Sequence, residues 1–253
     1  MPAHPLEPLF AEEIAAAAAC IRAQAGLDPN SFFETITLDE PSRAERAAFN
    51  DSGTVPPRRA YVCCYERASN RTFRGRVDLD QEKLLSWEHV PGVQARIPPD
   101  EFDASDKIAK ADPRVVEALA KRGITDLDTV LIETWAPGNF GIEGEEGKRI
   151  AYCHCWVIND AGDNRYGRPI ANLHPVMDLA AGKVLRVDDF GVVPLPPDTA
   201  AIRPSEGLRD DVKPLDITQP EGPSFEIDGY AVRWQRWNVR VGFDLREGLV
   251  LHD

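Results

Sequence analysis

The chain has 253 residues, of which 43% are hydrophobic and 28% charged, a balance typical of folded soluble proteins rather than disordered ones. A net charge of −13 argues against proteins that bind nucleic-acid phosphates, and no apolar run approaches the ~20 residues of a membrane span. The length suits two domains of about 100 residues and a remainder.

The first residues contain no basic cluster followed by an apolar run, so no secretory signal is expected. The odd, scattered set of cysteines is typical of reduced thiols rather than of a disulfide framework. We therefore expect a cytoplasmic protein that engages neither nucleic acid nor membrane. The cysteines are Cys20, Cys63, Cys64, Cys153 and Cys155.

The first part of the chain predicts one helix followed by a meander of strands. Acidic residues Glu12 and Glu13 suit the positive start of a helix that runs to about Gln24, and Gly26 ends it. Alternating apolar residues then predict four strands before the Pro91-Gly92 break. These strands are 32–38, 59–66, 72–79 and 83–90.

The order then repeats. Helices are predicted at 101–111 and 113–121, and Gly123 ends the second one. Four strands follow, at 129–134, 149–158, 171–179 and 183–187. The pattern predicts an α+β fold in which a helix packs on an antiparallel sheet in each of two units. We see no residue-level identity between the units, so the expected repeat is one of architecture.

A segment rich in Pro and Asp, 194–214, predicts an extended linker. Strands are expected after it at 224–227, 232–243 and 248–252, with a turn at Asp228-Gly229. The predicted domains are therefore 1–93, 94–193 and a terminal part, 194–253.

Three motifs that could carry chemistry have simpler interpretations. Strand alternation places Cys153 and Cys155 on one face and His154 on the other, so buried cysteines are expected rather than a zinc site. No two of the five histidines are near neighbours in sequence. The glycines of 137–147 have the wrong spacing for a phosphate loop, and the glutamates between them would repel phosphate, which favours a solvated acidic loop.

Four aromatic residues are candidates for a ligand-binding role, because three of them fall in or beside predicted loops. They are Phe102, Trp135, Phe140 and Tyr166. Aromatic residues in loops can line a ligand channel, although packing in a core is the commoner role.

The chain resembles the copper-containing primary amine oxidases over essentially its whole length. The C-terminal segments of this sequence resemble the beginning of that family's catalytic β-sandwich: Ile217–Phe225 (ITQPEGPSF), Trp234, Trp237, Val241–Phe243 and Arg246–Leu249. Earlier segments of the sequence resemble parts of the two small domains that precede this β-sandwich in the family: His4–Leu6, Ser86–Gly92, Asp112–Arg114 and Gly138–Gly141.

This resemblance implies two cystatin-like α+β domains, a linker and the first strands of a truncated β-sandwich. It implies a homodimeric enzyme that uses copper and a topaquinone, made from one of its own tyrosines, to oxidise primary amines to aldehydes with release of ammonia and hydrogen peroxide. The two small domains would support the catalytic domain and shape the mouth of the substrate channel. By position, Phe102, Trp135 and Tyr166 look like channel residues.

The family's active site, however, is missing from this sequence. The quinone precursor lies in an Asn-Tyr-Asp/Glu motif, and none of the five tyrosines follows an asparagine. The copper site needs a His-x-His pair, which is also missing. We therefore assign no catalytic and no metal-binding residue and expect neither cofactor to bind this chain alone. The expected partner is the family's catalytic domain.

Two other functions remain open. The chain could be a non-catalytic interaction module or one half of a split amine oxidase. A stand-alone enzyme with unrelated chemistry has no motif in its support.

Overall fold

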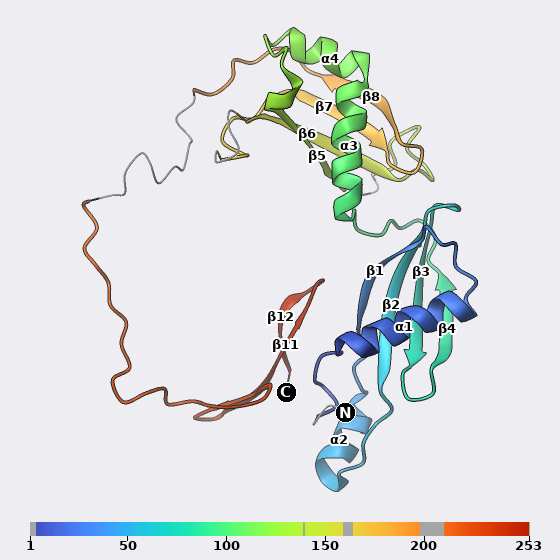
Figure 1. Ribbon diagram of the computed structural model, residues 1–253, viewed down its shortest axis with the longest axis vertical. Helices are drawn as coiled ribbons and strands as arrows, with labels where there is room; N and C mark the ends of the chain where they lie inside the picture. The colour runs from blue at the N-terminus through green and yellow to red at the C-terminus, as the bar shows by residue number, and fades with distance from the viewer. Residues whose placement is uncertain (1–3, 139, 159–163, 198–209, 253) are drawn as a thin grey trace. The chain divides into compact units, whose positions relative to one another are not determined.

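Helix α1 (Ala11–Gln24) lies across one face of a four-stranded antiparallel sheet, as Figure 1 shows. The helix buries Ala17, Cys20 and Ile21, whose spacing of three and one places them on one stripe. The strands follow one another in sheet order as they do in sequence: β1 (Phe32–Leu38), β2 (Arg59–Glu66), β3 (Arg71–Asp78) and β4 (Lys83–His89).

The same plan recurs further along the chain. Helices α3 (Pro99–Ala111) and α4 (Pro113–Ala120) are followed by the short helix η1 (Leu127–Thr129) and by a second antiparallel sheet, also in sequence order. Its strands are β5 (Val130–Trp135), β6 (Ile150–Val157), β7 (Leu173–Asp178) and β8 (Lys183–Asp189). The predicted α+β fold, a helix on an antiparallel sheet in each unit, is confirmed.

This computed structural model describes residues 4–138, 140–158, 164–197 and 210–252. It divides into two compact units, one of residues 1–95 with 215–253 and one of residues 96–214. The described parts of the predicted linker, 194–197 and 210–214, contain no helix or strand, whereas the rest of that linker lies outside the described residues. The division into domains 1–93, 94–193 and 194–253 stays a prediction.

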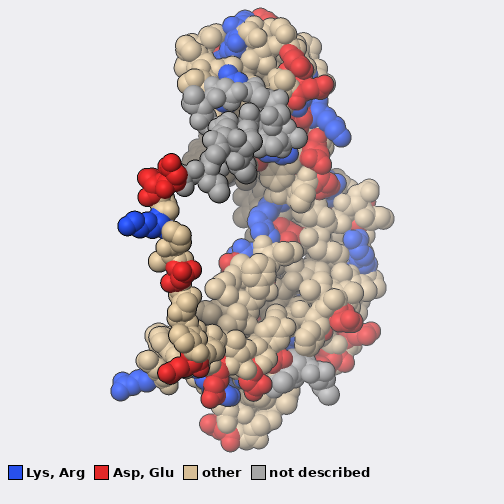
Figure 2. All heavy atoms as spheres, turned by 60° about the vertical axis from the view of Figure 1, so that its left-hand side comes forward, with Lys and Arg blue, Asp and Glu red and all other residues tan. Residues whose placement is uncertain are grey.

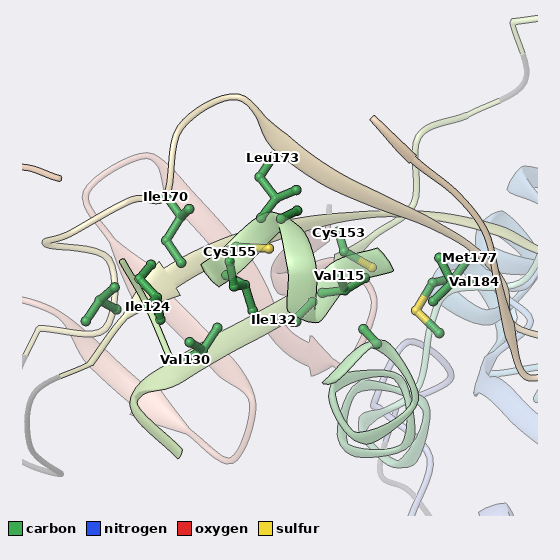
Figure 3. Close-up of a cluster of buried hydrophobic side chains, with 14 residues drawn as sticks. Val115, Ile124, Val130, Ile132, Cys153, Cys155, Ile170, Leu173, Met177 and Val184 are labelled. Atoms are coloured by element: carbon green, nitrogen blue, oxygen red, sulfur yellow. The ribbon is translucent and has the colours of Figure 1, made fainter. Parts of the chain in front are cut away.

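The core of the second sheet forms between α3, α4 and one face of β5–β8. Figure 3 shows Cys153 and Cys155 among the aliphatic side chains Val115 and Ile132. The prediction that these two cysteines are buried is confirmed, and burial raises the pKa of the Cys153 thiol to about 12.

The two units share more than architecture. A buried arginine stands immediately before the second strand of each sheet, Arg58 before β2 and Arg149 before β6. Each pairs with the glutamate at the third residue of the first helix of its unit: Arg58 with Glu13 of α1 at 2.8 Å and Arg149 with Glu101 of α3 at 2.8 Å.

The arginines also bind the backbone that leads into these helices. The guanidinium of Arg58 donates to the Pro8 carbonyl at 2.9 Å, and that of Arg149 donates to the Arg96 carbonyl at 3.0 Å. In each unit, one ionic cluster therefore ties the start of the helix to the sheet.

The turn after the third strand repeats as well. Asp78-Leu79 and Lys83 in the first unit correspond to Asp178-Leu179 and Lys183 in the second. Each aspartate accepts the backbone N–H three residues later, and each neighbouring strand pair carries a register shift one residue earlier. Our expectation that the units share no residue-level identity was therefore wrong.

The short helix η1 and two further elements were not predicted. Helix α2 (Arg43–Ser52) lies between β1 and β2. The expected single strand 232–243 is a hairpin of β10 (Ala231–Trp234) and β11 (Trp237–Asp244), because Gln235, at φ 53°, turns the chain. With β9 (Glu226–Asp228) and β12 (Gly248–His252) it forms a third sheet in the order β12-β11-β10-β9.

No described helix is long and apolar enough to cross a bilayer. On the face shown in Figure 2, carboxylate and basic side chains are interspersed, and the residues drawn in colour there form no large basic patch.

Candidate aromatic site on the second sheet

On the face of the second sheet that α3 and α4 leave uncovered, five rings contact one another, and we call this cluster the aromatic face: Trp135, His154, Trp156, Tyr166 and His174. Strand alternation produces it, because the residues of β6 that flank the buried cysteines point to the opposite side. The prediction that His154 and Trp156 share a face is confirmed.

The rings contact one another in a continuous series. Centroid distances are 6.0 Å for Trp135 and His154, 5.9 Å for His154 and Trp156, and 5.2 Å for Trp156 and Tyr166. The Trp135–His154 and Trp156–Tyr166 contacts are edge-to-face, an arrangement that favours fixed ring orientations.

Glu133 holds the two outermost rings. The indole Nε1–H of Trp135 donates to Glu133 Oε2 at 3.0 Å, and the phenol of Tyr166 donates to Glu133 Oε1 at 3.0 Å. The hydrogen bond to the carboxylate raises the pKa of Tyr166, because it stabilises the protonated phenol. Trp135 and Tyr166 are nevertheless each 55% exposed.

His154 and His174 lie side by side, with ring centroids 5.2 Å apart. The His154 side chain is exposed, but partial desolvation and the neighbouring His174 lower its pKa, and Glu133 opposes this shift. Among the described residues, no group of three or more His, Cys, Asp and Glu side chains could hold a metal ion.

The three predicted channel residues fall in different elements. Trp135 ends β5, Tyr166 follows in a turn, and both bind Glu133. Phe102 is half-buried in the first turns of α3, on the other side of the sheet. It follows Glu101, the partner of Arg149, and therefore lies towards the end of the sheet at which β6 begins and β5 ends. Their role in a channel stays a prediction.

The glycine-rich segment is largely exposed, in agreement with the predicted solvated loop. Glu145 is an exception, because it accepts hydrogen bonds from Arg186 at 2.7 Å and from the Tyr152 hydroxyl at 2.9 Å. Phe140 is exposed, whereas Asn139 lies outside the described residues.

Sequence reasoning missed Glu133 and the contact between the two histidines. The β5–β6 register places Glu133 opposite His154, and the β6–β7 pairing brings His174 to the same rings. A one-residue change of register would move these side chains to the other face, so the strand sequences alone do not specify the contacts.

Comparison with known proteins gives one consistent result. Residues 4–90 match the model of the copper amine oxidase N2 domain, and residues 100–201 match that of the copper amine oxidase N3 domain. A primary amine oxidase of Arthrobacter sp. (strain P1) is 40% identical over 252 residues, which are 98% of this chain and 38% of the relative. A peroxisomal copper-containing diamine oxidase of Nicotiana tabacum is 32% identical over 98% of this chain and 37% of its own length.

Among solved structures, a copper-containing benzylamine oxidase from Hansenula polymorpha superposes with a TM-score of 0.77 at 22% identity. It matches 99% of this chain and 42% of its own chain, and it supports the fold. The chain thus spans about two fifths of the length of these relatives. With its N2 and N3 domains in order, the chain belongs to the copper amine oxidase family and corresponds to the N-terminal portion of its members.

Proposed function

We propose that the chain is the N-terminal part of a copper/topaquinone primary amine oxidase. The complete enzyme would convert a primary amine, O2 and water into an aldehyde, ammonia and hydrogen peroxide. The observation that carries the proposal is the pair of N2 and N3 matches, in order, together with 40% identity to a primary amine oxidase along nearly the whole chain.

The residues of this chain do not fit the copper site or the quinone precursor. The sequence contains no His-x-His pair and no tyrosine after an asparagine. The two histidines that do meet, His154 and His174, have no third ligand among the described residues. Copper and topaquinone would therefore belong to the catalytic part of the complete enzyme, and no catalytic step is assigned to this chain.

The role proposed for the chain is to support the catalytic domain and to shape the route by which the amine enters. Its two α+β domains would hold the catalytic domain, and Phe102, Trp135 and Tyr166 would lie at the mouth of the substrate channel. Exposure of Trp135 and Tyr166 supports this role, because a rim residue must reach the substrate. We further propose that the complete enzyme is a cytoplasmic homodimer.

The second candidate is a non-catalytic module or one half of a split amine oxidase that another polypeptide completes. The apolar side chains exposed on β10–β12 favour the split enzyme, since a partner sheet would cover them.

The first test is the nucleotide sequence that follows the codon for Asp253. If any reading frame there encodes an Asn-Tyr-Asp/Glu tyrosine and a His-x-His pair, the proposal predicts that the joined or co-expressed product, loaded with copper, releases peroxide from primary amines. A stop codon followed by no such motifs would contradict the oxidase proposal and favour the non-catalytic module.

A further inference from the structure

Glu133 presents a fixed carboxylate between two exposed aromatic rings. It lies on the same face of β5 as Trp135, whereas Ile132 and Thr134 point into the protein. Because Trp135 and Tyr166 each donate to a different carboxylate oxygen, both the carboxylate and the rings are oriented before any ligand arrives.

Within the part of the chain that the structure describes, the Glu133 carboxylate has no ion-pair partner. None of the ion pairs among the described residues involves Glu133. His154, its neighbour across the strand pair, forms no ion pair with it, and partial desolvation and His174 lower the pKa of that histidine although Glu133 raises it. Arg165 lies near enough to lower the pKa of Tyr166 but forms no ion pair with Glu133.

A carboxylate beside exposed aromatic rings is suited to a primary ammonium group. The carboxylate accepts a charge-assisted hydrogen bond, and the negative faces of indole and phenol rings attract the same cation. A neutral donor can hydrogen-bond the carboxylate but lacks both the ionic attraction and the cation–π attraction, and an anion is repelled. A chain with a net charge of −13 also raises the local concentration of cations.

We propose that Glu133 is a specificity-determining residue that binds the ammonium group of cationic amines, in particular the distal ammonium of a diamine, against Trp135 and Tyr166. This inference rests on the proposed function, because it assigns the residue to amine entry. The competing interpretation is that Glu133 only positions the two rings.

The test measures binding to the chain itself, without catalysis. The chain is labelled with 5-fluorotryptophan, and its five tryptophan signals are followed by 19F NMR during titration with 1,4-diaminobutane. Trp135→Phe identifies the Trp135 signal. We expect that signal to shift saturably with the diamine and to stay unchanged with butan-1-ol, which has a similar chain and no charge.

Three variants separate ammonium binding from ring positioning. Glu133→Gln keeps an oxygen acceptor and removes the charge, and should weaken diamine binding at least about threefold. Tyr166→Phe removes one hydrogen bond to Glu133 and keeps the ring and the charge, and should bind nearly as well as the unchanged chain. Glu143→Gln removes an exposed charge elsewhere in the same unit and should have no effect.

The inference is overturned if the diamine shifts the Trp135 signal no more than butan-1-ol does. It is equally overturned if Glu133→Gln binds as tightly as the unchanged chain, or if Tyr166→Phe weakens binding as much as Glu133→Gln. These results are independent of peroxide release by the completed enzyme, so an active oxidase whose Glu133 binds no amine would refute this inference alone.

Discussion

The free-energy cost of breaking an ion pair depends on its burial, as the pair of Arg149 and Glu101 illustrates. The Arg149 side chain is 0% exposed and pairs with Glu101 at 2.8 Å, whereas the pair of Lys121 and Glu117 at the C-terminal end of α4 is largely exposed. Removing one member of a buried pair leaves an uncompensated charge, and removing one member of an exposed pair leaves a hydrated one.

We therefore expect Glu101→Gln to lower the free energy of unfolding of the second unit by about 3 kcal/mol. The matched surface change, Glu117→Gln, should lower it by less than about 1 kcal/mol. Urea unfolding curves for the two variants measure the difference. Equal shifts of the two midpoints would show that Arg149 finds another partner or reaches water.

In the repeated turn after the third strand of each sheet, Glu82 and Gly182 occupy equivalent positions. Both have positive φ, 49° and 61°, a conformation that costs a residue with a side chain about 1 kcal/mol or more. Glycine avoids that strain but loses more backbone entropy on folding, which offsets part of the gain.

Glu82→Gly is accordingly expected to stabilise the first unit by about 0.5 kcal/mol, and Gly182→Ala to destabilise the second by about 1 kcal/mol. Thermal unfolding of each variant gives the sign. Opposite signs for the two changes confirm the shared turn; a destabilising Glu82→Gly would contradict it.

At the scale of elements, α2 shows which signals a hydrophobic pattern overlooks. The helix buries no side chain, so it has no apolar stripe for a periodicity search to find. Its signals are terminal: Ser42 and Glu45 form a reciprocal capping box, and Gly53 ends the helix in the left-handed conformation. Both ends of α2 could therefore have been predicted from these cap residues in the sequence.

The hairpin between β10 and β11 was harder to predict. Its turn uses Gln235 with positive φ where a glycine or asparagine would be the usual signal. By contrast, α1, α3, α4 and the strands of the first two sheets were predicted to within about two residues because alternation and helix-start signals agree there. Trp135 and Tyr166 were singled out by their place in the predicted strands and loops and by the resemblance, whereas Glu133 could be placed only from the strand register.

The cap of α2 should respond to pH. Hydrogen bonds from Arg59 first, and then from the Ser42 backbone N–H, lower the pKa of Glu45 from 4.5 to about 2. A carboxyl whose pKa is lower in the folded state stabilises it fully above pH 4.5 and loses that effect as the pH falls towards 2. Glu45→Gln should therefore weaken α2 by about 1 kcal/mol at neutral pH and hardly at all near pH 2.

Hydrogen exchange of peptides covering 43–52, compared between variant and unchanged chain at the same pH, measures this loss. Asp51→Asn, in the same helix but away from the cap, is the control and should not reduce protection. A Glu45→Gln effect of the same size at both pH values would show that the carboxylate charge has no part in it.

At the scale of the whole chain, the third sheet exposes several large apolar side chains to water. Exposed fractions reach 65% for Trp237, 67% for Phe243 and 66% for Leu249, all on β11 and β12. In the sheet order, β12 and β9 are the outer strands, and unpaired strand edges can pair with another chain. Large exposed apolar surfaces favour association for the same reason that cores form.

The chain alone should therefore self-associate through 215–252, and deleting the residues after Val193 should relieve this association. Because a deletion also removes the linker, the sharper variant is the full chain with Trp237→Lys and Leu249→Lys, which places charge on the same strands. Sedimentation velocity over a range of concentrations measures the outcome. If the unchanged chain is monomeric and the amides of β11 are protected from exchange, the sheet is stable without a cover, and the argument for a partner that completes it loses its physical basis.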